Sequence, residues 1–315
     1  MQITQVALAG NVDVDGVANF YADGLGFLRA GGMALSGPEV AGLQGLDVSN
    51  VDFRMRWLVD RTEFMQLELF EYTEPASRPR RRNWSPAEVG YNVVSVFVTD
   101  FDRALESLSD QGAGPIAGVL GAVGERRTTV RDPNRNIIEV MEKDLAPDVP
   151  AAQPQAAAAL RAVRLTVLDL ANATHYFTQT LGLAPSTQAI HDASHEQLWG
   201  LDGRTPELVT LTDGRIFLEL AHYGEETQER PKGCRISDEG VLNIALATTD
   251  LQDYADTRSK VLEAGKHVVQ PEAMLGPALR GCYTTSEQGH SVELFYCAPF
   301  AWADFGFVPV PPSED

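Results

Sequence analysis

Short apolar runs of strand length alternate with amphipathic, helix-like segments along the whole chain, and the same order occurs twice. Both halves contain an apolar run with a carboxylate set in it, Phe-Met-Gln-Leu-Glu-Leu in one and Arg-Ile-Phe-Leu-Glu-Leu in the other. Three matched pairs of segments show the repeat: 64–69 with 215–220, 90–100 with 240–250, and 136–140 with 290–294. This self-similarity predicts one fold written twice.

An aspartate ends four of the predicted strands, at the point where an amphipathic helix begins. These residues are Asp13, Asp100, Asp169 and Asp250. An aspartate in this place can accept hydrogen bonds from the free N–H groups of the first helical turn. Short apolar stretches separated by Gly, Pro, Asn or Asp turns follow each helix. The class predicted is therefore α+β with mixed sheets, and each half contains two strand-helix-strands units.

The length of 315 residues predicts two domains, at about 150 residues for each. A Pro- and Ala-rich stretch near the midpoint, residues 146–159, is the expected linker. The domains then span residues 1–145 and 160–299. Residues 300–315 form an aromatic and Pro-rich tail, which we expect to pack across a seam between domains or subunits.

Charge and composition narrow the functional classes. Lys and Arg number 25 against 44 Asp and Glu, and the resulting net charge of −19 disfavours nucleic acid and anionic membranes as partners. No secretory signal or membrane span is evident, so a cytoplasmic location is expected. The three cysteines lack the number and spacing of a disulfide framework or zinc cluster.

The order of motifs resembles that of the vicinal oxygen chelate superfamily, which includes glyoxalase I, extradiol dioxygenases and bleomycin-resistance proteins. The resemblance lies in Phe-Tyr and then Leu-Gly after the first helix, and in Asp-Pro-Asn-Arg-Asn-Ile-Ile-Glu at 132–139. It implies two tandem domains, each of paired βαβββ units that curl into a cup-shaped mixed sheet. Metal-using members hold the ion with a His or Gln on the first strand, a Glu on the fourth, a His on the fifth and a Glu on the eighth.

In the second half, these four places correspond by resemblance to Ala162, Glu219, Asn243 and Glu293. Two of the residues are poor metal ligands. Arg164 shares the strand face of Ala162, so the expected second cup contains an arginine among carboxylates. Arg164 would anchor an anionic or phenolic oxygen while one Glu moves a proton. The alternative is a static ion-pair cluster that fills a cup without a metal.

In the first half, the corresponding places are Gln5 or Val6, then Glu68, Val93 and Glu139. We favour Gln5, because Val6 then faces the helices. A site of Gln5, Glu68 and Glu139 would offer oxygen ligands only, which suit Mg²⁺, Mn²⁺ or Ca²⁺.

Histidines are absent from all of these places. All six lie in the second half, and iron(II) oxygenases need a pair of imidazoles with one carboxylate, so ring cleavage is disfavoured. His191 and His195 have helical spacing, but the Asp and Pro around them indicate a loop, and a metal pair is not expected there. His290 follows a glycine and is expected to be exposed.

The sequence therefore predicts a protein without a cofactor that binds a small, aromatic, oxygenated molecule, and that would act as an isomerase or lyase if it is an enzyme. The expected catalytic residues are Glu293, Glu219 and Arg164, and the expected substrate-binding residues are Asn243, Tyr283 and Trp199. Two alternatives remain open. One is a non-catalytic drug- or metabolite-binding protein, and the other is a divalent-metal enzyme that uses the oxygen-only site. A homodimer is also compatible with the sequence.

Overall fold

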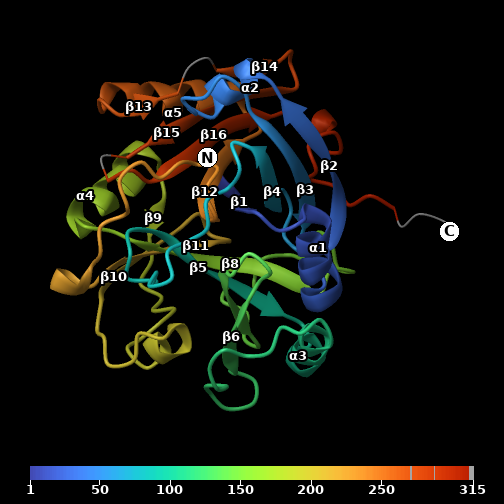
Figure 1. The fold of residues 1–315 in the computed structure, drawn as a ribbon, viewed down its shortest axis with the longest axis vertical. Coiled ribbons are helices and arrows are strands. Elements are labelled where there is room, and N and C mark those ends of the chain that lie inside the picture. Colours follow the sequence, from blue (N-terminus) through green and yellow to red (C-terminus); the bar gives the residue numbers. More distant parts are fainter. Residues whose placement is uncertain (270–271, 287, 312–315) are drawn as a thin grey trace.

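Two mixed β-sheets form the body of the computed structural model, which describes residues 1–269, 272–286 and 288–311 (Figure 1). The first sheet has nine strands: β1 (Gln2–Gly10), β2 (Leu28–Ser36), β3 (Asp52–Val59), β4 (Gln66–Glu74), β12 (Gly240–Thr248), β13 (His267–Val268), β14 (Ala273–Leu275), β15 (Leu279–Thr285) and β16 (Ser291–Cys297). The second has seven: β5 (Gly90–Val98), β6 (Arg127–Arg131), β7 (Ile137–Met141), β8 (Ala158–Thr166), β9 (Ala184–Pro185), β10 (Glu207–Thr212) and β11 (Phe217–His222).

Each sheet draws its strands from both halves of the chain. Unit 1 (β1–β4) joins unit 4 (β12–β16) through the antiparallel pair β1–β12, and unit 2 (β5–β7) joins unit 3 (β8–β11) through β5–β8. The α+β class and the paired βαβββ units are confirmed. The expected pairing of units within each half is wrong, because the first strand of every unit offers a similar edge and the repeat does not specify its partner.

Helices begin where the aspartates predict. The side chains of Asp13, Asp100, Asp169 and Asp250 accept backbone N–H bonds in the first turns that follow them. The helices are α1 (Val14–Asn19), α2 (Pro38–Leu43), α3 (Phe101–Asp110), α4 (Leu170–His175) and α5 (Leu251–Glu263). Among the described residues, no helix is long and apolar enough to cross a membrane.

The largest buried core joins the helices to one face of each sheet. Val6 and Leu8 of β1 pack there with Val163 and Leu165 of β8, together with helix residues such as Tyr21. Because successive side chains of a strand point to opposite faces, the opposite faces are left to line two concave surfaces. The orientation of β1 is the one predicted, with Val6 toward the helices.

The linker and the tail both pack against the body of the protein. Residues 158 and 159 of the expected linker are part of β8. In the tail, Trp302 stacks on Phe64 with 4.8 Å between ring centroids, and the backbone N–H of Val310 donates to the oxygen of Arg29 at 2.9 Å. The described part of the tail thus packs on the first sheet, while residues 312–315 lie outside the described residues.

Candidate functional site

The concave face of the first sheet, named here the open cup, brings together one polar residue from each of four strands. Gln5 lies on β1, Glu68 on β4, Asn243 on β12 and Glu293 on β16. Each corresponds to a position that the resemblance assigned to a metal ligand. The pairing of unit 1 with unit 4 places them in one cup rather than two.

Strand register relates these four residues by an approximate two-fold symmetry. Glu68 of β4 lies beside Ala7 of the parallel strand β1, and Ala7 is two residues beyond Gln5 on β1. In the same way Glu293 is level with Ala245, two residues beyond Asn243. The antiparallel pair β1–β12 sets Ala7 opposite Asn243 and Gln5 opposite Ala245. Gln5 is therefore the counterpart of Asn243, and Glu68 is the counterpart of Glu293.

Two expected groupings of site residues are corrected by this arrangement. Glu219 and Arg164 lie in the second sheet and do not share a cup with Glu293. Glu139 also lies in the second sheet, so it cannot complete an oxygen-only site with Gln5 and Glu68. The reason is again the antiparallel joint between β1 and β12.

A cavity of about 830 Å³ occupies the open cup. Its volume is in the range of sites for small organic ligands. Most of its wall is aromatic or aliphatic, with Tyr283, Glu68, Glu293 and Gln5 among the polar exceptions. The apolar lining includes Met33, Phe53, Met55, Trp57, Phe70, Phe295, Phe305 and Phe307. Helix α2 and strand β14 contribute to one part of the wall, and the C-terminal tail contributes to another.

The two carboxylates of the open cup hold protons unusually tightly. Burial raises the pKa of Glu68 to about 7, although the indole N–H of Trp57, which donates to Glu68 Oε1 at 3.0 Å, opposes the rise. Burial and then the nearby charge of Glu68 raise the pKa of Glu293 to about 8, while the Tyr283 hydroxyl lowers it by hydrogen bonding. The pair therefore retains proton near neutral pH.

The amide side chains of the open cup leave polar atoms without a partner in the described part of the protein. Gln5 Nε2 donates to Gln66 Oε1, and Gln66 Nε2 donates to the backbone oxygen of Phe305 at 2.8 Å, which fixes both amides. Gln5 Oε1 and both amide atoms of Asn243 are buried and have no hydrogen-bond partner among the described residues. Because buried polar atoms are normally bonded, these three atoms indicate a ligand, ion or water.

The concave face of the second sheet, named here the filled cup, has a different content. The imidazole of His191 lies between two carboxylates, with Nδ1 at 2.9 Å from Glu219 and Nε2 at 2.9 Å from Glu139. Burial alone would lower the pKa of His191, but the charges of Glu219 and Glu139 outweigh it and raise that pKa to about 9. An imidazolium therefore occupies the space between the carboxylates.

Arg164 extends this buried network. It donates to Glu219 and Glu196, each at 2.6 Å, and its guanidinium lies 4.2 Å from the ring of Trp199. All four side chains are buried. Trp199, expected to bind substrate, thus covers an arginine in the filled cup, whereas Tyr283 does line the cavity of the open cup.

His191 and Glu196 are the residues that sequence reasoning missed. The segment 186–206 between β9 and β10 carries both into the filled cup, whereas the matching segment 37–51 between β2 and β3 forms α2 at the wall of the open cup. The sequence His-Asp-Ala-Ser-His-Glu is a signal in retrospect, because it places basic and acidic groups together in the long segment that connects two strands of the cup. His290, expected to be exposed, is 3 % exposed.

Comparisons with known proteins agree on the fold. No family model matches the chain, and no curated protein matches it. Among solved structures, glyoxalase I from Zea mays aligns with a TM-score of 0.61 and 14% identity over 94% of this chain and 92% of that one. A putative dioxygenase from Bacillus subtilis aligns with a TM-score of 0.63 and 15% identity over 99% and 91%. The chain has the vicinal oxygen chelate fold, as the sequence motifs predicted.

Proposed function

We propose that the open cup binds a small, largely apolar, oxygenated molecule and that Glu68 and Glu293 transfer a proton on it, as in an isomerase or a lyase. The observation that supports this most directly is a pair of carboxylates, with pKa values of about 7 and about 8, in an apolar cavity of about 830 Å³. A general base works best when its pKa is near the operating pH, and burial has brought this pair there.

The two carboxylates have different surroundings, and this difference assigns their roles. Trp57 donates to Glu68 and stabilises its ionised form, so Glu68 acts as the base. Glu293 has the higher pKa and keeps its proton, so it acts as the acid. Glu68 takes a proton from the carbon next to a substrate carbonyl, while Glu293 gives its proton to the carbonyl oxygen. The product is an enol and two carboxyl groups that have exchanged protonation states.

An isomerisation is complete when Glu68 returns a proton to carbon and the enol O–H gives its proton back to Glu293. An elimination is complete when the group on the next carbon leaves with the proton held by Glu68, while the enol O–H proton returns to Glu293 and the carbonyl re-forms. Gln5 lines the cavity and offers a carbonyl oxygen for orienting substrate. Asn243 lies on the same concave face without lining the cavity, and neither its amide nor the Gln5 oxygen is engaged by a described residue. The aromatic wall favours a substrate with an aromatic or other flat apolar body.

The same four side chains also fit a hard divalent cation. Two carboxylates and two amide oxygens are the donors that Mg²⁺ and Mn²⁺ prefer, and the amide oxygens of Gln5 and Asn243 are free of described partners. Such an ion, when bound, would polarise a carbonyl oxygen. None of these four side chains is an imidazole, so the donor set does not match the pair of imidazoles with one carboxylate that iron(II) oxygenases use.

Exchange of hydrogen with solvent tests the proposal without knowledge of the natural substrate. The protein is incubated in D₂O with neutral aryl ketones, and loss of the hydrogens next to the carbonyl is followed by proton NMR, with chelator present and then with Mn²⁺. We expect exchange with chelator present, and a decrease of about 10²–10⁴-fold in both Glu68→Gln and Glu293→Gln. Glu39→Gln, at an exposed glutamate of the same cavity wall, is the matched control.

Two results would contradict the proposal. Exchange at the same rate in all three variants would show that the exchange does not depend on the carboxylate pair. Saturable ketone binding, seen as quenching of Trp57 fluorescence, without exchange under either condition would favour the non-catalytic binding protein instead.

A further inference from the structure

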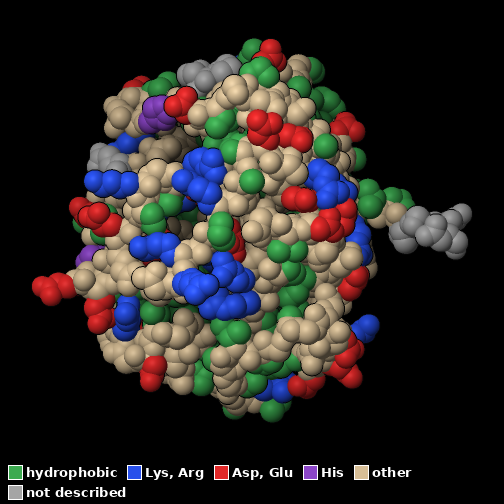
Figure 2. Space-filling model, in the orientation of Figure 1, with side chains coloured by type: hydrophobic (Ala, Val, Ile, Leu, Met, Phe, Trp, Pro, Cys, Tyr) green, Lys and Arg blue, Asp and Glu red, His purple; other side chains and the backbone are tan. Residues whose placement is uncertain are grey.

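A second, smaller pocket of about 220 Å³ lies between two loops that the internal repeat relates, and it shares no residue with the cavity of the open cup. One loop precedes β5 and begins with Arg78-Pro79, and the other precedes β12 and contains Arg230-Pro231. Five cationic side chains line the pocket, against three carboxylates. Figure 2 shows Lys and Arg side chains gathered near the centre of one face of a protein whose net charge is −19.

The guanidinium of Arg80 is held in this pocket without an ion pair to any described carboxylate. Its guanidinium carbon lies 4.0 Å from the centroid of the Trp84 ring. On the other side it packs against Gly240, where an added Cβ would lie 2.9 Å from Nη2. Nη1 of Arg80 is buried and has no hydrogen-bond partner among the described residues. The positive group is therefore fixed in place, with one donor unused.

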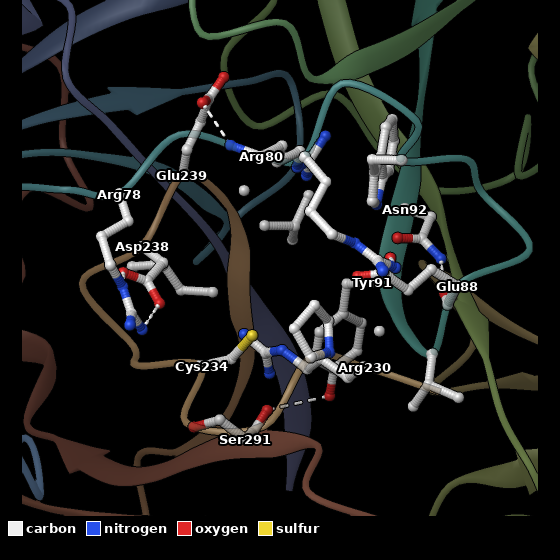
Figure 3. A pocket seen from close by; sticks show the side chains of 18 of the residues that line it. Arg78, Arg80, Glu88, Tyr91, Asn92, Arg230, Cys234, Asp238, Glu239 and Ser291 are labelled. Atoms are coloured by element: carbon white, nitrogen blue, oxygen red, sulfur yellow. Dashed lines mark hydrogen bonds and ion pairs between the residues drawn. The ribbon is translucent and has the colours of Figure 1, made fainter. Parts of the chain in front are cut away.

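Arg230 and His290 supply further unpartnered donors. No hydrogen bond or ion pair to another described residue is found for the Arg230 guanidinium, and Figure 3 draws no dashed line from it. His290 is 3 % exposed, lines the pocket, and its Nε2 atom has no partner among the residues described. Burial and the charge of Arg230 lower the pKa of His290 to about 3, so the imidazole is neutral and can donate.

The three carboxylates of the pocket wall are engaged elsewhere. Figure 3 shows Arg78 bonded to Asp238 and the backbone of Arg80 bonded to Glu239. Glu239 also accepts from Arg135 at 2.9 Å, and Glu88 pairs with Arg81. Asp132, whose charge reaches Arg80, accepts from Tyr21 at 2.9 Å. Within the part of the chain that the structure describes, Arg80 and Arg230 are thus left without a direct counter-charge.

We propose that this pocket binds a small oxyanion of the phosphate class through Arg80, Arg230 and His290. Arg80 and Arg230 are half-buried, but Arg80 Nη1 and His290 Nε2 are buried donors that call for an acceptor, and guanidinium groups match the oxygen geometry of phosphate. The volume is below the range for drug-sized ligands, so it fits inorganic phosphate or the phosphate group of a small ester. The proposal is independent of the chemistry in the open cup.

Calorimetric titration of the full chain with inorganic phosphate, methyl phosphate and acetate tests it. We expect saturable phosphate binding that weakens with added salt, and a loss of at least about tenfold in Arg80→Gln and in Arg230→Gln. Tighter binding of methyl phosphate would indicate that the pocket takes the phosphate group of an organic ester. Tighter binding of inorganic phosphate would indicate that it takes the free ion. Arg103→Gln, on the exposed surface of α3, is the control.

A second variant and a second signal keep the test decisive if one of the arginine variants misfolds. Gly240→Ala would push the Arg80 guanidinium aside and would also strain the backbone, since Gly240 has a φ of +149°, so thermal unfolding is measured for each variant to show that it keeps its fold. Phosphate should also raise the pKa of the His290 imidazole in NMR spectra. Equal affinities for acetate and phosphate, equal affinities in Arg230→Gln and Arg103→Gln, or no saturable binding up to about 10 mM would each overturn the proposal.

Discussion

Glu68 and Glu293 occupy equivalent positions in the two units that form the open cup, although 225 positions separate them in the sequence. Each stands level with an alanine of the strand that joins the units. The charge of Glu68 raises the pKa of Glu293, which shows that the two carboxylates interact across the approximate two-fold axis. The filled cup has the same symmetry, but there an imidazolium separates Glu139 from Glu219.

Stability should decrease with rising pH because of the open-cup pair. The unfolded chain has ordinary glutamates of pKa 4.5, whereas the folded values are about 7 and about 8. The folded protein therefore binds more protons between those values, and this contribution to stability disappears as pH rises through them. Glu293→Gln should be more stable than the unmodified protein by up to about 5 kcal/mol at about pH 9, at about 1.4 kcal/mol for each pKa unit, with a difference of less than about 1 kcal/mol at about pH 5. Urea unfolding at the two pH values measures this; a difference independent of pH would contradict it.

His191 should be essential for the stability of the filled cup. His191→Gln leaves Glu139 and Glu219 buried without the cation between them, which should cost about 3–5 kcal/mol at neutral pH. The folded pKa of about 9 lies above the ordinary 6.5, so the contribution of His191 is complete below the lower value and is lost as pH rises through the higher one. Urea unfolding across this range measures the loss. His222→Gln, at a half-buried histidine, is the control, and an equal effect in both variants would refute the prediction.

Much of the fold follows from the sequence. The aspartates at the four helix starts and the alternation that directs Val6 and Gln5 to opposite faces are local features, and the structure has both. The partner of β1 is not a local feature. Four similar units offer similar edges, and the choice between β5 and β12 depends on packing that no short segment contains.

The candidate site was predictable residue by residue but not as an assembly. Gln5, Glu68, Asn243 and Glu293 were each assigned a place on the concave surface, and all four lie there. Their meeting in one cup depends on the long-range pairing. His191 was missed because it belongs to a loop, where no periodic pattern indicates which side chains turn inward.

Binding of Mn²⁺ should depend on the proton held by the open-cup pair. The ion would bind Glu68 and Glu293 in their ionised forms, so binding must release a proton and should strengthen from about pH 6 to about pH 9. Electron paramagnetic resonance of free Mn²⁺ measures the affinity. Glu68→Gln should weaken binding and leave only the pH dependence that Glu293 contributes, whereas Glu39→Gln should keep the full dependence. Tight binding that is the same at both pH values would contradict this prediction.

Gly306 should control the position of Trp57. A Cβ atom at Gly306 would lie 2.5 Å from the Trp57 ring and 2.6 Å from Gln66 Nε2, and the residue also has a φ of +72°. Gly306→Ala should displace the indole, weaken its bond to Glu68, and shift the intrinsic fluorescence. Gly203→Ala tests backbone strain alone, because Gly203 has a φ of +80° and open space around it. An unchanged spectrum in Gly306→Ala, or the same change in both variants, would exclude the steric cause.

The joint between β1 and β12 has a consequence for synthesis on the ribosome. Strand β1 ends at Gly10, but its antiparallel partner β12 begins only at Gly240, so the half of the cavity wall that unit 1 supplies has no opposite side until most of the chain has been made. The central pair β5–β8 closes sooner, so the filled cup can mature on the nascent chain while the open one cannot. The progress of translation, rather than local folding, therefore sets the moment at which Glu68 first comes close to Glu293.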